Sequence, residues 1–343
     1  MPDNQFRKNL GAAGQLIAGI LIIVVIILVL QNLLGLVQVR SAPSGWQIIR
    51  PPQEVSTLII ENDTVWTGGK DGVILIGRSN GTRLSTPGNT PSFGYVRQIF
   101  RDHDGWIWVG HDGGLARYRN GSWQVIAPAP GVPFSKVLSL AQQHDGTIIT
   151  GTDSDVLSYR NGSWLSLLGQ DSLSIASADV LLVDRSGDLW VGCGQPSRGG
   201  LYRLHDTTWS TFTLNDGLPH QSVRGIAQAR DGTLWVATGF SRQGGAALFS
   251  GGKWTRLTVR DGLAGESTRS VYEDDAGRMW IGSEYDGVAV GTPGSWEILT
   301  EKDGLAGYEV KIMTQDPDGT YWLGTNSGLN RIDKKSVLPV DIK

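Results

Sequence analysis

The sequence predicts an all-β fold built from repeated units, and composition, repetition and strand pattern each point to it. The chain has 47 glycines and 13 tryptophans among 343 residues, which suits many tight turns beside large flat side chains. A turn followed by an apolar strand with a tryptophan, as in "DRSGDLWVG", recurs along most of the chain. Each recurrence belongs to a unit with four short β-type runs and no amphipathic helix of useful length.

The spacing of these units predicts a seven-bladed β-propeller of four-stranded blades. Equivalent positions are separated by 42, 41, 41, 45, 45 and 42 residues, a period typical of propeller blades when each unit holds four strands. Asp-Gly pairs and "NGS" segments supply the positive backbone angles that tight hairpins need. The equivalent positions are Trp66, Trp108, Ile149, Trp190, Trp235, Trp280 and Trp322.

The seventh unit has no outermost strand of its own, so a terminus must close the ring. In most units this strand opens with a tryptophan, but the last unit ends at "GLNRIDKK" without one. Trp46, in "GWQIIRP", stands ahead of the first unit, and an open ring would leave a sheet edge unpaired. We therefore expect residues 45–49 to pair with the blade built from residues 310–332. The C-terminal "VLPVDI" is the alternative, since Pro339 is tolerated on an edge strand.

An apolar segment ahead of the repeats predicts one N-terminal transmembrane helix over residues 16–37. As a helix it reaches about 33 Å, enough to cross the hydrocarbon core. Arg7 and Lys8 precede it, which favours a cytoplasmic N-terminus and an extracytoplasmic propeller at the cell membrane. The alternative is a cleaved signal peptide, which exports the same propeller. The predicted organisation is a cytoplasmic tail at 1–15, a signal-anchor helix at 16–37, a linker at 38–44 and the propeller at 45–343.

Charge and composition argue against several classes of function. A net charge of −3 gives no basic stripe, so nucleic acid is not an expected partner. Cys193 is the single cysteine, which excludes an intrachain disulfide. The acidic segment "TDSD" has no further ligands of the kind that a calcium loop requires. We therefore predict neither a metal site nor a cofactor.

The units at 216–239 and 261–283 resemble the two-component regulator propeller repeat. They carry its "GL", "D-x-x-G-x-x-W-x-G" and "GL-x-R" elements, and the resemblance extends over about residues 45–333. In that family such propellers form the extracytoplasmic sensor part of membrane histidine kinases and detect ligands such as carbohydrate fragments. The resemblance implies a sensor propeller at the membrane. Because no kinase is expected in this chain, a separate membrane signalling protein is the expected partner.

One face of the propeller is the expected ligand site. The connections from fourth to first strand and from second to third strand share that face around the channel. Two of these connections, "CGQPSRGG" and "TGFSRQGG", are longer than the others and carry Arg198 and Arg242 on adjacent blades. Two guanidinium groups suit a carboxylate, a phosphate or an acidic sugar. The alternative is a pair of solvated loop tips.

Further side chains are expected on the same face. Glu284, Tyr285 and Tyr308 place aromatic rings beside carboxylates, a combination suited to sugars but also found in ordinary polar loops. His111 and His220 are expected to face each other across the channel. This arrangement resembles the placement of catalytic groups in streptogramin lyase propellers, whose other motifs are not matched.

Ligand sensing or ligand binding outside the membrane, for a carbohydrate or anionic molecule, is the predicted function. We predict no catalytic residue and expect the chain not to be an enzyme. The first alternative is a protein-interaction scaffold at the outer side of the membrane. The second is a propeller lyase or hydrolase, in which a histidine serves as general base.

Overall fold

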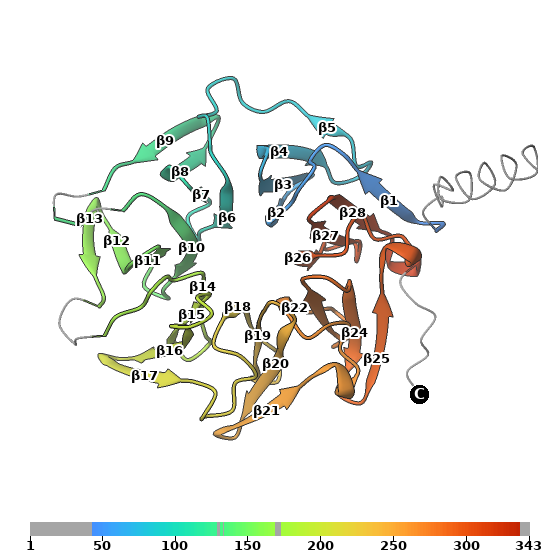
Figure 1. Cartoon of the computed structure of the whole chain (residues 1–343). Coiled ribbons are helices and arrows are strands. Elements are labelled where there is room, and N and C mark those ends of the chain that lie inside the picture. Colours follow the sequence, from blue (N-terminus) through green and yellow to red (C-terminus); the bar gives the residue numbers. More distant parts are fainter. Residues whose placement is uncertain (1–42, 129–130, 133, 169–172, 337–343) are drawn as a thin grey trace, which may run out of the picture. The chain divides into compact units, whose positions relative to one another are not determined.

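The computed structural model describes residues 43–128, 131–132, 134–168 and 173–336. Over these ranges the chain forms seven four-stranded antiparallel sheets that follow one another around a ring (Figure 1). The predicted seven-bladed β-propeller is therefore confirmed. The tail at 1–15, the predicted transmembrane helix at 16–37 and the alternative closing segment "VLPVDI" lie outside the described residues. Within the described ranges, no helix has the length and apolar character needed to cross a bilayer.

Six blades are meanders that run from an innermost first strand to a fourth strand at the rim, and in the seventh blade the N-terminal strand β1 takes the fourth place (Figure 1). The first blade has the shortest fourth strand, in agreement with its lack of a tryptophan there. Short 3-10 helices η1 (Val259–Asp261) and η2 (Glu301–Asp303) join the fifth blade to the sixth and the sixth to the seventh, and η3 (Lys334–Ser336) follows the last strand. The strands of blades one to seven are β2 (Thr57–Glu61), β3 (Thr64–Gly69), β4 (Gly72–Gly77) and β5 (Arg83–Leu84); β6 (Val96–Arg101), β7 (Ile107–His111), β8 (Gly114–Arg119) and β9 (Ser122–Ile126); β10 (Val137–Gln142), β11 (Ile148–Thr152), β12 (Val156–Arg160) and β13 (Ser163–Ser166); β14 (Val180–Val183), β15 (Leu189–Cys193), β16 (Gly200–His205) and β17 (Thr208–Phe212); β18 (Val223–Gln228), β19 (Leu234–Phe240), β20 (Gln243–Ser250) and β21 (Lys253–Leu257); β22 (Thr268–Glu273), β23 (Met279–Ser283), β24 (Val288–Thr292) and β25 (Ser295–Leu299); and β26 (Val310–Gln315), β27 (Tyr321–Thr325), β28 (Gly328–Ile332) and β1 (Trp46–Ile49).

The ring closes as predicted, through the N-terminal strand β1. This strand pairs antiparallel with β28, with Trp46 opposite Ile332 and Ile49 opposite Leu329. The indole Nε1 of Trp46 donates a hydrogen bond to the carbonyl oxygen of Ser336 at 3.1 Å. Both edges of β28 are therefore occupied, one by β27 and the other by β1.

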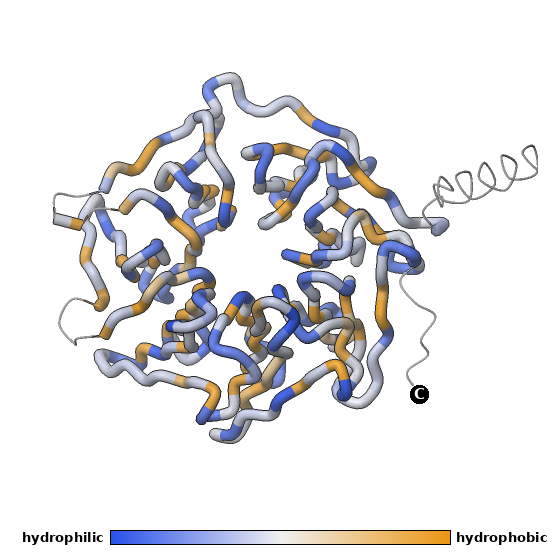
Figure 2. Tube along the Cα trace, in the orientation of Figure 1, coloured by the Kyte–Doolittle hydropathy of each residue, from blue (hydrophilic) through white to orange (hydrophobic). Residues whose placement is uncertain are grey.

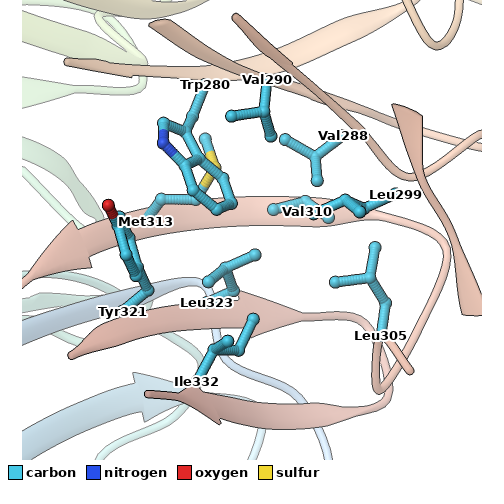
Figure 3. Close-up of a cluster of buried hydrophobic side chains, with 10 residues drawn as sticks. All are labelled: Trp280, Val288, Val290, Leu299, Leu305, Val310, Met313, Tyr321, Leu323 and Ile332. Carbon is cyan, nitrogen blue, oxygen red and sulfur yellow. The ribbon is translucent and has the colours of Figure 1, made fainter. Parts of the chain in front are cut away.

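Neighbouring blades are joined by apolar packing and by hydrogen bonds between their innermost strands. Trp280 of the sixth blade and Leu323 of the seventh are fully buried in one shared cluster (Figure 3). Nearer the axis, the Ser139 hydroxyl donates to the carbonyl of Ala178 at 2.6 Å and so bridges the third and fourth blades. Each blade thus completes the core of the next, which is why a single unit cannot be stable alone.

The repeated aspartate of the "D-x-x-G-x-x-W" motif accepts a hydrogen bond from the tryptophan of the same motif. In the sixth blade the Asp274 carboxylate accepts from Trp280 Nε1 at 2.9 Å and from the backbone N–H of Ala276 at 3.0 Å. Both Asp274 and Trp280 are 0% exposed. The motif therefore gives a buried indole the acceptor that it needs. The same bond joins Asp102 to Trp108, Asp184 to Trp190 and Asp316 to Trp322.

The two faces of the ring differ in the connections that they carry. Because each blade is an antiparallel meander, the turns after the first and third strands lie on one face and the other connections lie on the opposite face, here called the loop face. The sequence predicts a long loop at "TGFSRQGG" on this face, but the structure has an extended hairpin there. In the fifth blade, pairing continues to Phe240 opposite Gln243. Ser241 and Arg242 form its two-residue turn with φ of 50° and 61°, the left-handed values that a type I′ turn requires.

Candidate ligand site at the channel mouth

The candidate site begins with a β-bulge near the start of the innermost strand. In β6 the pairing register shifts by one residue between Val96 and Gln98, which leaves Arg97 as the extra residue. A bulge bends the strand locally and re-aims a side chain. The same shift occurs in four other blades, where the extra residues are Leu138, Arg224, Arg269 and Lys311.

These five residues line one pocket near the axis of the ring. Ser56 and Asp179, which directly precede β2 and β14, complete a set of one residue from every blade around a volume of about 300 Å³. Tyr95 and Glu309 complete the lining. The bulges lie where the innermost strands begin, so the pocket lies toward the loop face. Figure 2 shows hydrophilic residues at the inner ends of several blades around the centre of the ring.

The pocket is rich in charge, and cations outnumber carboxylates in its lining. The lining carboxylates are Asp179 and Glu309. Three more carboxylates, those of Glu54, Asp112 and Glu284, contact the cations from outside the lining. The lining therefore has two more cations than carboxylates, whereas the lining and the acids behind it together have five carboxylates for four cations. The lining cations are Arg97, Arg224, Arg269 and Lys311.

Arg97 and Lys311 are each firmly paired with a carboxylate. Two parallel bonds join Arg97 to Asp112, from Nε to Oδ1 at 2.7 Å and from Nη2 to Oδ2 at 3.0 Å. This pairing raises the pKa of the Arg97 guanidinium and lowers the pKa of the Asp112 carboxyl. Lys311 Nζ donates to Glu54 Oε1 at 2.6 Å. Burial alone would raise the pKa of Glu54, but bonds from Lys311 and Tyr95 lower it.

Arg269 lies between two carboxylates but is incompletely hydrogen-bonded. Its Nη2 donates to Glu284. Its Nε lies 3.1 Å from Glu309 Oε1, yet this buried atom has no partner that satisfies hydrogen-bond geometry among the described residues. The attraction to Glu309 is therefore electrostatic without a well-aligned bond.

Arg224 is the least compensated cation of the pocket. Its Nε donates to the Ser222 hydroxyl at 3.1 Å, and its Nη1 reaches Asp179 Oδ1 at 3.3 Å. The Asp179 carboxylate is already engaged through Oδ2, which accepts from the backbone N–H of Gly194 at 2.8 Å. Burial and the neighbouring Arg269 charge lower the pKa of the Arg224 guanidinium. An anion beside Arg224 would relieve both effects.

The two predicted loop arginines, Arg198 and Arg242, contact different groups. The guanidinium carbon of Arg242 lies 4.6 Å from the ring centroid of Tyr285, and Nη1 lies 3.9 Å from Asp286 Oδ1. Arg242 therefore leans toward the sixth blade. Arg198 is exposed on the fourth blade, and its carbonyl oxygen lies 3.8 Å from the thiol of Cys193. Joint binding of an anion by the two arginines therefore stays a prediction.

The acidic and aromatic residues predicted on the loop face divide between the pocket and the surface. Glu284 belongs to the channel mouth, because it accepts from Arg269 and, at 2.6 Å, from the Ser267 hydroxyl. Tyr285 lies under the Arg242 guanidinium. Tyr308 is 47% exposed, and its backbone carbonyl accepts from the N–H of Gly287 at 2.9 Å.

Each of the two predicted histidines is held by its own turn. Nδ1 of His111 accepts from the backbone N–H of Gly113 at 3.0 Å, and Nδ1 of His220 accepts from that of Ser222 at 2.9 Å. Burial lowers the pKa of both imidazoles, so both are neutral at pH 7. The His111 ring packs edge-on against Phe93. Neither histidine is part of the pocket lining, and no contact within the described ranges joins them.

Sequence reasoning missed the pocket cations, although a repeated signal marks them. The innermost strands open with "YVRQI", "SVRGI", "STRSV" and "EVKIM", each with a basic residue at the same place. That place is the bulge, and strict strand alternation gives no reason to aim it at the axis. No group of three or more His, Cys, Asp or Glu side chains suited to a metal ion occurs in the described part of the chain.

Three segments match the family described as "Two component regulator propeller", at residues 90–113, 217–240 and 262–285. Each matched segment contains the innermost strand of one blade and the second strand of the same blade. No curated protein sequence matches the chain. Three of the repeats are therefore similar to those of two-component regulator propellers.

Solved structures share the fold at low sequence identity. The extracellular domain of a putative hybrid two-component system from B. thetaiotaomicron is 18% identical with a TM-score of 0.70, over 85% of this chain and 42% of that chain. This chain thus spans less than half the length of that protein. Virginiamycin B lyase from Staphylococcus aureus is 14% identical with a TM-score of 0.66, over 84% and 98% of the two chains. YCF48, solved with a peptide bound, is 14% identical with a TM-score of 0.63, over 85% and 98%. Likeness at this level establishes the fold alone.

Proposed function

We propose that the propeller is the extracytoplasmic, ligand-binding part of a signalling system, and that a small ligand binds at the channel mouth. One observation carries the proposal: basic residues from four blades occupy the same bulge position and line a single pocket of about 300 Å³. Burial of charged side chains costs desolvation free energy, and the bulge with Leu138 in the third blade shows that the ring does not require a charge at this position. The three segments that match the two-component regulator propeller support a signalling context.

In this proposal residues 16–37 anchor the chain in the cell membrane with its N-terminus in the cytoplasm. The chain then passes the binding event to a separate membrane signalling protein. The support is the apolar character of the segment and the basic residues ahead of it, Arg7 and Lys8. Protease protection of the full chain in sealed membrane vesicles tests the orientation, because an extracytoplasmic propeller is digested only when the protease is on that side.

A thermal-shift screen of the full chain in detergent tests ligand binding. The screen covers oligosaccharides, uronic acids, organic acids, phosphates, peptides and divalent ions. A ligand at a hundred times its dissociation constant stabilises the folded state by about 2.7 kcal/mol, so a true ligand raises the melting temperature measurably. The same screen with Arg198→Ala plus Arg242→Ala shows whether the loop arginines contribute. No shift from any class would contradict the proposal.

A scaffold that holds another exported protein is the second candidate, and one observation favours it. Val125 on β9 and Leu165 on β13 are 72% and 65% exposed on the rims of adjacent blades. These two are the most exposed large apolar side chains of the described residues, and contiguous apolar surface marks interaction sites. Crosslinking in membranes compares the native chain with Val125→Ser plus Leu165→Ser. A crosslinked product that the double variant loses, in a chain without any small ligand, favours the scaffold.

A further inference from the structure

We propose that the ligand of the channel mouth is a small organic acid whose carboxylate group bridges Arg224 and Arg269. The inference rests on the proposed function and names the chemical class of its ligand. Three observations carry it: the placement of these two arginines on the fifth and sixth blades, their incomplete hydrogen bonding to nearby carboxylates, and the size and lining of the pocket.

The two arginines are held close together by the backbone. Both are bulge residues at the second position of adjacent innermost strands, β18 and β22, and both line the pocket. Gly225 follows Arg224, and a Cβ at Gly225 would lie only 3.0 Å from the carbonyl oxygen of Arg269 and 3.1 Å from the Cα of Ser270. Glycine therefore permits a close approach of the two strands and, with it, of the two guanidinium groups.

This approach places like charges beside each other with incomplete compensation. The Nη1 of Arg224 has a long contact of 3.3 Å to Asp179, whose other oxygen is already hydrogen-bonded. The Nε of Arg269 is buried without a well-aligned partner. A carboxylate between them gains charge-assisted bonds from both forks and removes the repulsion. Arg97 and Lys311 do not offer this arrangement. Arg97 bonds to Asp112 through both Nε and Nη2, and Lys311 Nζ donates to Glu54 at 2.6 Å. Arg269 bonds to Glu284 through Nη2 but leaves Nε without a well-aligned partner.

The remainder of the pocket selects for size and charge. A volume of about 300 Å³ is at the lower end for ligand pockets and suits a molecule of a few carbon atoms. The acids behind the lining disfavour a multiply charged phosphate more than a carboxylate, because each additional negative charge meets Glu54, Asp112 and Glu284.

Neutral sugars fit this lining less well. Sugar rings commonly stack on aromatic faces, and Tyr95 is the single aromatic residue of the lining. The Arg97 guanidinium carbon lies 4.3 Å from the centroid of the Tyr95 ring, so one ring face is already covered. The Tyr95 hydroxyl donates to Glu54 and is also engaged.

Calorimetric titration of the full chain in detergent with lactate, acetate, inorganic phosphate and glucose tests the inference. We expect lactate or acetate, each with a single carboxylate, to bind, and Arg224→Gln or Arg269→Gln to weaken that binding at least about tenfold. Arg224→Lys keeps the positive charge but loses the paired N–H donors of the guanidinium group. We expect this variant to lose less affinity than Arg224→Gln. Arg83→Gln, on the outermost strand of the first blade, is the matched control and leaves binding unchanged. Circular dichroism and melting temperature identify any variant that does not fold. If one of the three pocket variants does not fold, the other two test the inference.

The outcomes separate this inference from the proposed function. Carboxylate binding that the Arg224 and Arg269 variants lose supports both. Binding of glucose or phosphate in place of the carboxylates, or carboxylate binding unaffected by folded variants, overturns the inference and leaves the ligand-binding function standing. Failure of all four probes overturns the inference, and failure of the wider thermal-shift screen as well overturns the proposed function.

Discussion

Substitution of Asp274 by asparagine tests whether the motif aspartate stabilises the propeller through the indole of its own repeat. Asparagine has the same shape and keeps one oxygen for the backbone N–H groups of Ala276 and Arg278, which bond to Oδ1 in the native chain. The other oxygen, Oδ2, accepts from Trp280 Nε1 at 2.9 Å, from Arg278 Nε at 2.8 Å and from the Tyr321 hydroxyl at 3.1 Å. In the variant an amide NH₂ faces these three donors. The hydroxyl can rotate and accept instead, but the indole and the guanidinium lose their acceptor.

The expected loss is about 3 kcal/mol, because a buried donor without a partner costs about 1–3 kcal/mol and a broken buried ion pair costs more. Asp274 and Trp280 are fully buried, so water cannot replace the lost acceptor. Burial by itself would raise the pKa of Asp274, but the bonds from Trp280 and Arg278 hold the pKa below its usual value. The native carboxylate is therefore charged at pH 7 and its bonds are charge-assisted.

Thermal unfolding followed by tryptophan fluorescence measures the loss. With an unfolding entropy of about 2.1 cal/mol/K per residue over roughly 300 residues, 3 kcal/mol corresponds to about 5 °C. Asp275→Asn is the matched control, because Asp275 is the adjacent aspartate and is exposed. A melting temperature of Asp274→Asn within about 1 °C of the control would refute the reasoning, since the indole bond would then contribute nothing that a neutral side chain cannot.

Three further predictions concern other blades. Ala229→Asp places a carboxylate six residues before Trp235, as in four other blades, and should raise the melting temperature by about 1–2 °C; a fall would contradict it. The hydrogen bond to Asp188 raises the pKa of His205, so the protonated imidazole stabilises the folded chain until the pH rises through its folded-state pKa. His205→Gln should therefore lower the stability in urea more at about pH 5.5 than at about pH 9. An equal loss of stability at both pH values would contradict this prediction. Trp46→Ala removes a half-buried indole from the ring closure and should cost about 2 kcal/mol, measured as a lower urea midpoint, whereas an unchanged midpoint would show that β1 does not hold the ring.

Most of the fold was predictable because repetition averages out local ambiguity. A single "D-x-x-G-x-x-W" segment is compatible with many hairpins. Seven units at intervals of 41 to 45 residues predict a closed ring of blades. Because the last unit lacks a fourth strand, a strand from outside that unit has to complete the ring. The closing strand at Trp46 was predictable for the same reason. The extended hairpin at Ser241 and Arg242 was not, because neither residue type favours the left-handed backbone that both adopt.

The sequence predicts on which face of the propeller the candidate site lies, but not which residues line it. The meander places the second-to-third and fourth-to-first connections on one side, and the pocket lies toward that side. Residues that differ among the loops, such as Arg198 and His220, are the ones that sequence reasoning assigns to a ligand. A residue that recurs at equivalent places, as the pocket cations do, is usually structural. Arg224 and Arg269 show that a recurrent position can also carry charge to the channel mouth.

The bulge explains how a regular ring acquires a specific pocket. Along an ordinary strand, side chains alternate between the two faces of a blade, and both faces are packed against neighbouring blades. A side chain at the axis therefore needs a break in the alternation, and the extra residue supplies it without disturbing the pairing on either side. The backbone provides such a position in five blades, and Ser56 and Asp179 line the pocket from the other two. The identity of the residue at each place therefore decides the charge of the pocket. Leu138 and Ser56 occupy the same ring as Arg224, so substitution at these uncharged positions can change ligand preference with little effect on the core.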